Sequence, residues 1–342
     1  MNLQKEYSVD SYDYEFNESL IANEPIYPKE RAKLLIYFRE SKKIIHTDFG
    51  NILNYIPEDT SILFNNTKVI KARLFGKKES GGKVEILINR PLNENRISLF
   101  VKGKVKVGTK IAFSENLQLE ISELILDGSR VGKFFQFGNA LNFSELIEIL
   151  EKIGHIPLPP YISRNDNSYD EVDYQTIFAK ESGAVAAPTA SLHFSDQMLE
   201  KIEKSFKTAY LTLHVGAGTF KPVDVQDIRE HSLHKEVFQI GEDAKNMIDS
   251  DSKILAVGTT VTRTIEYYKK SGETSGEADI FLHPNSKPKR VDYLLTNFHL
   301  PKSTLLMLVS SFISISEMQR IYRDAIEKKY RFYSYGDAML IL

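Results

Sequence analysis

Two short loops rich in glycine and threonine each follow a predicted strand, and both are candidates for ligand binding. Gly216-Ala217-Gly218-Thr219 follows a strand predicted over 209–215, and Gly258-Thr259-Thr260 follows one predicted over 254–257. Glycine lets a backbone approach a ligand closely, and loop amides can bind an anion or a carboxylate. Ligands of open α/β sheets bind at the carboxyl ends of strands, where both loops are expected. A tight turn and a Thr-capped βα connection are the plain structural alternatives.

The first loop does not predict a dinucleotide site. That fingerprint needs a third glycine, and Lys221 stands in its place. A phosphate-binding loop of the GxxxxGK[ST] type is absent as well.

Two stiff polar corners add further candidates. Pro188-Thr189-Ala190 precedes His193, and Asn297 and His299 precede Pro301. Proline restricts the backbone, so each corner would hold its polar side chains in fixed positions. Each histidine is either a structural group with satisfied hydrogen bonds or a group that moves protons.

The segment from Glu230 to Glu236 carries His231 and His234 between two carboxylates. The histidines would share one face of a helix, which suggests a metal site, but the spacing is not HExxH. A solvated polar turn is the alternative. We expect no metal and interpret these residues as candidates for proton transfer or substrate contact.

Composition narrows the chemistry and the location. The chain has 342 residues and no cysteine, which excludes disulfides, thiolate metal sites and a cysteine nucleophile. Residues 1–23 are polar without an apolar core, so no signal peptide is expected. The longest apolar run, Leu305–Ile315, is too short for a bilayer span of ~20 residues. We therefore expect a cytoplasmic protein without membrane contact.

Charge is distributed unevenly along the chain. The whole sequence has a formal net charge of −2, yet residues 66–113 carry twelve Lys or Arg against three Glu. Such a segment indicates a polyanionic partner, with a solvated basic face as the alternative. The candidates for nucleic-acid contact are Lys68, Lys71, Arg73, Lys77, Lys102, Lys104 and Lys106.

The basic segment is typical of a small β-barrel or sandwich. Short alternating stretches are separated by turn residues, and no helical period interrupts them. The predicted strands are 69–75, 83–89, 96–101, 104–113, 117–126 and 131–137.

The flanking sequence alternates helices and strands. Asn142 begins a helix with Glu145 as its capping-box partner, and Ser195 begins another. Strands are also predicted over 279–282, 293–296 and 338–342. This pattern predicts an α/β domain, residues 1–65 and 142–342, with a largely parallel open sheet covered by helices on both faces. Residues 66–141 would be an inserted barrel domain.

Six or more segments occur in an order that resembles one enzyme family, the S-adenosylmethionine:tRNA ribosyltransferase-isomerases of queuosine biosynthesis. They are Asn65–Gly76, Gly154–Tyr161, Gly183–Phe194, Leu211–Val223, Leu255–Arg263, Thr296–Leu306 and Tyr330–Ala338. The resemblance extends over nearly the whole chain, and it implies the same fold, an α/β domain carrying a small barrel.

The resemblance also implies a reaction. The ribosyl group of S-adenosylmethionine would be transferred to 7-aminomethyl-7-deazaguanine at the wobble position of a tRNA anticodon. The product would be epoxyqueuosine, with adenine and methionine released, and no metal would take part. A monomer is expected for this family.

Site residues follow from the matching motifs and, for His231 and His234, from the segment 230–236. The catalytic candidates are His193, His214, His231, His234 and His299, with a proton-transfer role expected for His214, His231 or His299. Arg263 would pair with a carboxylate. The candidates for binding S-adenosylmethionine are Pro188, Thr189, Gly216, Gly218, Thr219, Gly258, Thr259, Thr260, Arg263 and Asn297. The alternatives are a non-catalytic RNA-binding protein and a nucleotide-dependent α/β enzyme.

Overall fold

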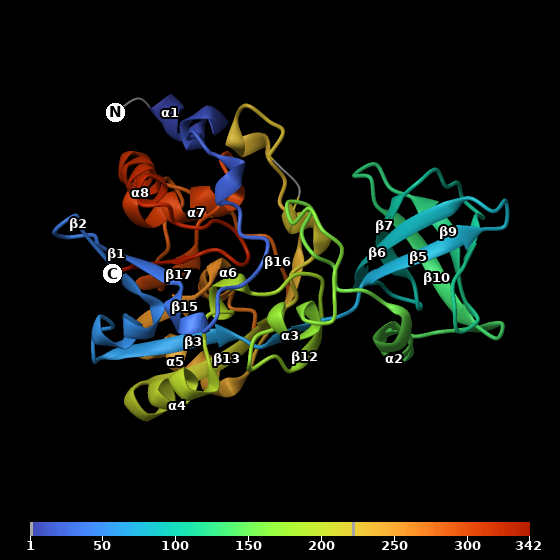
Figure 1. Ribbon diagram of the computed structural model, residues 1–342, viewed down its shortest axis with the longest axis horizontal. Coiled ribbons are helices and arrows are strands. Elements are labelled where there is room, and N and C mark those ends of the chain that lie inside the picture. Colours follow the sequence, from blue (N-terminus) through green and yellow to red (C-terminus); the bar gives the residue numbers. More distant parts are fainter. Residues whose placement is uncertain (1–2, 221–222) are drawn as a thin grey trace.

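A nine-stranded mixed sheet forms the centre of the larger domain in the computed structural model, which describes residues 3–220 and 223–342 (Figure 1). The strand order is β16-β14-β13-β3-β15-β17-β18-β1-β2. The strands are β1 (Lys33–Phe38), β2 (Lys43–Asp48), β3 (Thr60–Asn65), β13 (Lys207–Leu213), β14 (Glu236–Ile240), β15 (Lys253–Val257), β16 (Ser275–Ala278), β17 (Tyr293–Asn297) and β18 (Ala338–Ile341).

The middle of this sheet is parallel, and its margins are antiparallel except that β1 runs parallel to β18. β13, β3, β15 and β17 run in one direction, so their carboxyl ends meet at one edge. Every residue of β3 is buried, as expected for a strand covered on both faces. β14, β16, β18 and β2 each pair antiparallel with a neighbour. The α/β prediction is confirmed, and the sheet is more mixed than the largely parallel one expected.

Helices cover both faces of the sheet, as predicted. On one face α4 (Asp196–Ser205) packs against alternate side chains such as Leu255 and Val257. On the other, α5 (Glu242–Asp249) and α6 (Thr259–Ser271) pack against Ile254 and Ala256. The last two helices, α7 (Thr304–Ile313) and α8 (Ile315–Glu327), cover β1, β17 and β18 from that same side.

Shorter helical elements and a small ladder complete this domain. The helices are α1 (Leu3–Tyr7) and α3 (Asp170–Asp173), and the two-stranded ladder joins β4 (Thr67–Val69) to β12 (Glu181–Ala184). No helix in the described ranges has the length and apolar character needed to cross a membrane.

A separate antiparallel barrel projects from the α/β domain (Figure 1). Its strands follow the order β10-β7-β6-β5-β8-β9, and the pairing of β10 with β9 closes the ring. The strands are β5 (Arg73–Lys78), β6 (Lys83–Pro91), β7 (Ile97–Lys102), β8 (Lys110–Ala112), β9 (Leu117–Leu124) and β10 (Arg130–Gln136), with β11 (Asn139–Ala140) added to β10.

The helix after the barrel confirms its predicted start. α2 (Phe143–Ile153) begins at Asn142, whose side chain accepts from the Glu145 amide at 3.0 Å while the Glu145 carboxylate accepts from the Asn142 amide at 2.8 Å. Its buried face joins the hydrophobic core of the barrel. The domain boundary at residue 141 stays a prediction, and we infer that α2 belongs with the insert.

Three strand predictions are wrong. The strand expected over 69–75 is divided, because β4 ends at Val69 in the ladder with β12 and β5 begins at Arg73 in the barrel. Asp279–Leu282 is not a strand, because the segment before it, β16, takes the place beside β14 at the sheet edge. The strand expected over 104–113 shrinks to β8, because Gly108 at φ 80° forms a turn that breaks the alternation.

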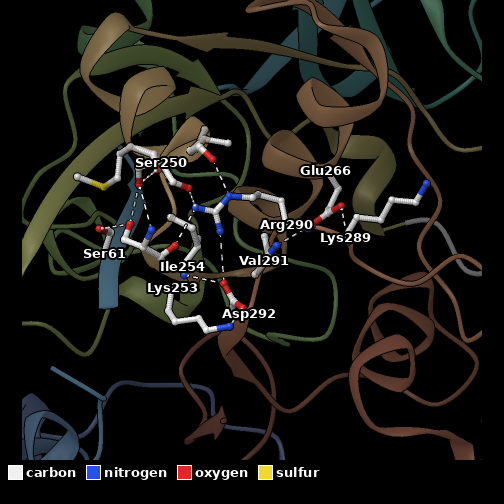
Figure 2. Close-up of polar contacts among 12 residues, drawn as sticks. Ser61, Ser250, Lys253, Ile254, Glu266, Lys289, Arg290, Val291 and Asp292 are labelled. Carbon is white, nitrogen blue, oxygen red and sulfur yellow. Dashed lines mark hydrogen bonds and ion pairs between the residues drawn. The ribbon is translucent and has the colours of Figure 1, made fainter. Parts of the chain in front are cut away.

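A buried polar network holds α6 against the loop that leads into β17. The Glu266 carboxylate on α6 accepts from the amides of Lys289, Arg290 and Val291, each at 2.8 Å. In Figure 2 the Arg290 guanidinium points the other way, toward Asp292 and the loop around Ser250. Since the first turn of α6 lies at the candidate site, this network fixes the position of one wall of that site.

Candidate functional site

A cavity of about 650 Å³ lies at the carboxyl ends of β15 and β17, and we call it the main cavity. This is the edge where the sequence predicted a ligand. Predicted residues that line it are Pro188, Thr189, Gly258, Thr259, Thr260, Arg263, Asn297 and His299. Its volume falls within the range of roughly 300–1,000 Å³ that is usual for small-molecule sites.

The first turn of α6 forms one wall of the main cavity. Gly258 precedes this helix at φ 100°, a conformation that side chains rarely adopt, so glycine is needed there. Thr259 and Thr260 follow and line the cavity. The amides of this turn have no acceptor four residues back within the helix, so the wall favours anionic or acceptor groups.

The two predicted polar corners meet behind the cavity. Thr189 donates its hydroxyl to Asn297 Oδ1 at 2.9 Å, and Asn297 Nδ2 lies 3.3 Å from His193 Nε2. His193 is buried against the Phe49 ring and does not line the cavity. Burial lowers its pKa to about 3. His193 is therefore a neutral group that orients Asn297.

Arg263 is a buried cation with unused donors. It is 9% exposed, and its Nη1 lies 2.5 Å from Glu236 Oε2 on β14. Its Nε and Nη2 have no hydrogen-bond partner within residues 3–220 and 223–342. Buried guanidinium donors are costly to leave unpaired, which indicates a ligand with acceptor oxygens at this point.

His299 is the histidine that faces the main cavity. Its Nε2 lies 2.8 Å from Thr296 Oγ1, and its amide donates to the Tyr322 hydroxyl at 3.1 Å. Burial lowers its pKa to about 3, so the imidazole is neutral at physiological pH. A neutral imidazole can accept a proton or donate a hydrogen bond without carrying charge.

Aromatic residues complete the cavity, and sequence reasoning missed them. The rings of Tyr161 and Tyr333 stack with their centroids 4.4 Å apart, and both line the cavity with Tyr174. Tyr333 has φ 70°, and its buried hydroxyl has no partner in the described part of the chain. Tyr161 and Tyr333 lie in segments that resemble the family and Tyr174 does not, and in a chain with 17 tyrosines the residue type alone gave no signal.

The first glycine loop does not present free amides to the main cavity. Its Gly216 amide donates to Glu236 Oε1 at 3.3 Å, and the Ala217 amide donates to Asn89 Oδ1 of the barrel at 3.0 Å. Gly218 packs against the ring of His234, where a Cβ would approach Cδ2 to 2.4 Å. This loop joins the domains. The side chain of Thr219 and all of Lys221 lie outside the described residues.

His214 lies in a second cavity of about 490 Å³ between the barrel and the α/β domain. Its Nδ1 is 2.7 Å from Thr67 Oγ1, and burial lowers its pKa. Glu236 lines this second cavity as well as the main cavity, so the two are neighbours.

His231 and His234 do not share a helical face, which corrects that expectation. A short 3₁₀ turn, Ile228–Glu230, ends before them, and His231 adopts an extended backbone. Both line a smaller cavity of about 330 Å³ together with Glu236 and Arg263. No group of three or more metal-ligating side chains occurs where the chain is described.

The basic candidates on the barrel fall into two sets. Lys77, Lys102, Lys104 and Lys106 are exposed. Lys71 pairs with Glu171 at 2.9 Å and Arg73 with Glu85 at 2.7 Å, while Lys68 is partly buried in β4. Lys102 is exposed, but its ammonium lies 3.8 Å from the Glu85 carboxylate. Paired cations attract phosphate less than free ones, so Lys77, Lys104 and Lys106 are the stronger candidates.

Comparisons with known proteins agree along the whole chain. Residues 9–341 match the family model described as queuosine biosynthesis protein. The S-adenosylmethionine:tRNA ribosyltransferase-isomerase of Nitratiruptor sp. is 59% identical over 98% of this chain and 98% of its own, and that of Aliarcobacter butzleri is 57% identical over 97% and 98%. The crystal structure of the Thermotoga maritima S-adenosylmethionine tRNA ribosyltransferase is similar, with 32% identity, a TM-score of 0.55 and coverage of 97% of this chain and 100% of that one.

Proposed function

The chain belongs to the queuosine biosynthesis protein family, and from this we propose that it transfers and isomerises the ribosyl group of S-adenosylmethionine onto a tRNA base. The acceptor is 7-aminomethyl-7-deazaguanine at the wobble position of the anticodon. Adenine and methionine leave, and the tRNA carries epoxyqueuosine. The relatives' names support the donor and the tRNA; the base and its position come from the family resemblance.

One observation carries the placement of the donor: the half-paired guanidinium of Arg263 in the main cavity. S-adenosylmethionine has a carboxylate that would accept from its two free donors, a bidentate geometry that arginine favours. The polar first turn of α6 and the stacked tyrosines supply hydrogen-bonding and aromatic surfaces for the rest of the molecule. Aromatic faces also attract cations, and the donor carries a sulfonium.

His299 is assigned the proton-transfer role next to the sugar. The sulfonium makes the C5′ hydrogens of the donor mildly acidic, and departing adenine must be protonated. Of His214, His231 and His299, only His299 lines the main cavity. It is neutral at physiological pH, so a ring nitrogen can accept a proton from the donor, and its lowered pKa means that the protonated ring would readily pass this proton on to departing adenine. His214 and His231 would then contact the RNA side of the site.

The barrel is assigned to the tRNA. Its exposed lysines would contact backbone phosphates, and such contacts position the RNA without reading its sequence. We further propose that the enzyme is cytoplasmic, acts as a monomer and uses no metal.

The decisive experiment measures adenine release. Purified protein is incubated with S-adenosylmethionine and tRNA that carries 7-aminomethyl-7-deazaguanine, and the same tRNA with guanine at the wobble position is the control. We expect adenine only with the modified tRNA. RNA binding without adenine release would favour the non-catalytic alternative, and a nicotinamide absorbance in the purified protein would favour the alternative of a nucleotide-dependent α/β enzyme.

A further inference from the structure

A second binding surface lies outside the main cavity, in a groove between the barrel and the loop after α2. It has a volume of about 820 Å³, and we call it the barrel groove. One side consists of outward-facing residues of β5, β6 and β7, and the other is the proline-rich segment 157–165. Pro160 lines both this groove and the main cavity, so the two spaces are adjacent.

The barrel side of the groove is apolar where a solvated strand would be polar. Residues alternate along β6: Val84, Ile86 and Ile88 are buried inside, while Leu87 points outward. On the outer face Leu87 is the cross-strand neighbour of both Arg73 and Phe100. Outward apolar side chains that touch across strands indicate a surface covered by something else.

Cations border this apolar patch. In the next cross-strand row Glu85 lies beside Lys102, and Glu85 pairs with Arg73 at 2.7 Å and with Lys102 at 3.8 Å. The groove is lined by three cations, Arg73, Lys102 and Arg164, and two carboxylates, Glu85 and Asp127, which leaves an excess of one positive charge. Lys102 and Lys104 are exposed at this end of β7. An occupant with an aromatic face and a negative group fits this combination better than a peptide or a second copy of the chain.

We propose that the barrel groove binds a nucleotide of the tRNA next to the modified base, with its base stacked on Phe100 and its phosphate near Lys102. This inference rests on the proposed function, because the main cavity must receive the neighbouring nucleotide. Aromatic side chains stack on any base without reading it, so the groove holds the strand in position rather than selecting its sequence.

The test uses the full-length protein and an anticodon stem–loop RNA with 2-aminopurine beside the wobble position. Phe100→Leu keeps an apolar side chain but removes the aromatic face, and Phe100→Tyr keeps it. We expect Phe100→Leu to weaken RNA binding roughly 5- to 150-fold, as the loss of a base–aromatic stack predicts, and to abolish quenching of the 2-aminopurine. Phe100→Tyr should bind like the wild type.

The matched control is Phe137→Ala, an aromatic residue 76% exposed at the β10–β11 turn that does not line the groove; we expect wild-type affinity. S-adenosylmethionine binding should stay unchanged in every variant. Unaltered RNA affinity of the Phe100→Leu variant would contradict nucleotide binding in the barrel groove, even if the wild type releases adenine. If Phe100→Leu weakens RNA binding but the wild type releases no adenine, nucleotide binding in the barrel groove is supported and the proposed ribosyl-transfer reaction is contradicted. A dimer that only Phe100→Leu dissociates would assign the groove to a second copy.

Discussion

At the residue scale, Arg263 and Glu236 connect the parts of the site. Glu236 borders the main cavity, the cavity of His214 and the cavity of His231 and His234. It also accepts from Gly216 in the loop that contacts the barrel. Arg263 thus has one guanidinium nitrogen, Nη1, fixed by the protein and two, Nε and Nη2, left for a ligand.

Replacing Arg263 with Lys tests this division. Lysine keeps the charge beside Glu236 but cannot form a two-donor fork. We expect the dissociation constant for S-adenosylmethionine to rise roughly 10- to 150-fold, the effect of losing hydrogen bonds to a charged group. Titration calorimetry measures the change, and the thermal unfolding midpoint shows whether the fold is intact. A folded variant with wild-type affinity would contradict the assignment.

The two buried histidines predict how stability depends on pH. Burial lowers the pKa of His193 and His299 to about 3, whereas an unfolded histidine titrates near ~6.5. Below that value the unfolded chain binds protons that the folded chain does not, so stability is full above about pH 6.5 and falls as the pH decreases toward 3.

His193→Gln separates this effect from acid denaturation by other groups. One such histidine contributes a slope of at most about 1.4 kcal/mol per pH unit in that window. We expect urea unfolding of the variant to lose less stability than the wild type between pH 6.5 and 5. Parallel curves for the two proteins would show that His193 titrates normally in the fold.

At the element scale, α6 depends on its buried carboxylate. Glu266→Ala leaves three amides of the segment before β17 without their acceptor. We expect a loss of roughly 3–5 kcal/mol in the free energy of unfolding and weaker S-adenosylmethionine binding, since the first turn of α6 lines the main cavity. Denaturant titration measures the first and calorimetry the second. Glu273→Ala, at an exposed position just beyond the same helix, should change stability by less than ~0.5 kcal/mol.

Elements with local signals were predictable from sequence. The helix starts at Asn142 and Ser195 were predictable because each side chain accepts a hydrogen bond from an amide in the first turn of its helix. The strand β15 and the helix α6 were predictable because an apolar run ends in glycine. Elements whose structure depends on a neighbouring strand could not be predicted from sequence. β16, with the sequence SGEA, owes its strand geometry to β14, and β1–β3 were not delineated before the structure. Eight of the predicted residues line the main cavity. The contact of Glu236 with Arg263 and the stacked tyrosines could not be predicted, because they join segments far apart in the chain.

At the scale of the whole molecule, the donor and the RNA are expected to bind through different forces. Exposed lysines of the barrel would release counterions from the RNA, whereas the donor binds in a buried cavity. We therefore expect salt to weaken tRNA binding strongly and S-adenosylmethionine binding little. If salt weakened the binding of both ligands equally, the proposal that the barrel lysines bind RNA would be contradicted.

Lysine substitutions localise that salt response. Changing Lys77, Lys104 and Lys106 together to Gln should lower the slope of log affinity against log salt by roughly 2, from about 0.7–0.9 per phosphate contact. Lys201→Gln on α4, also exposed, is the matched control and should leave the slope unchanged.

The neck of the insert has a consequence for how such proteins diversify. The chain enters the barrel at Arg73 and returns past His155, and these two residues exchange backbone hydrogen bonds as an antiparallel bridge at 3.2 and 2.9 Å. The entering and returning segments are therefore held side by side at one isolated bridge. A recombination event at this point could exchange the barrel for another module without changing the path of any strand of the nine-stranded sheet. If the barrel binds RNA as proposed, substrate binding could then change while the α/β domain stays the same.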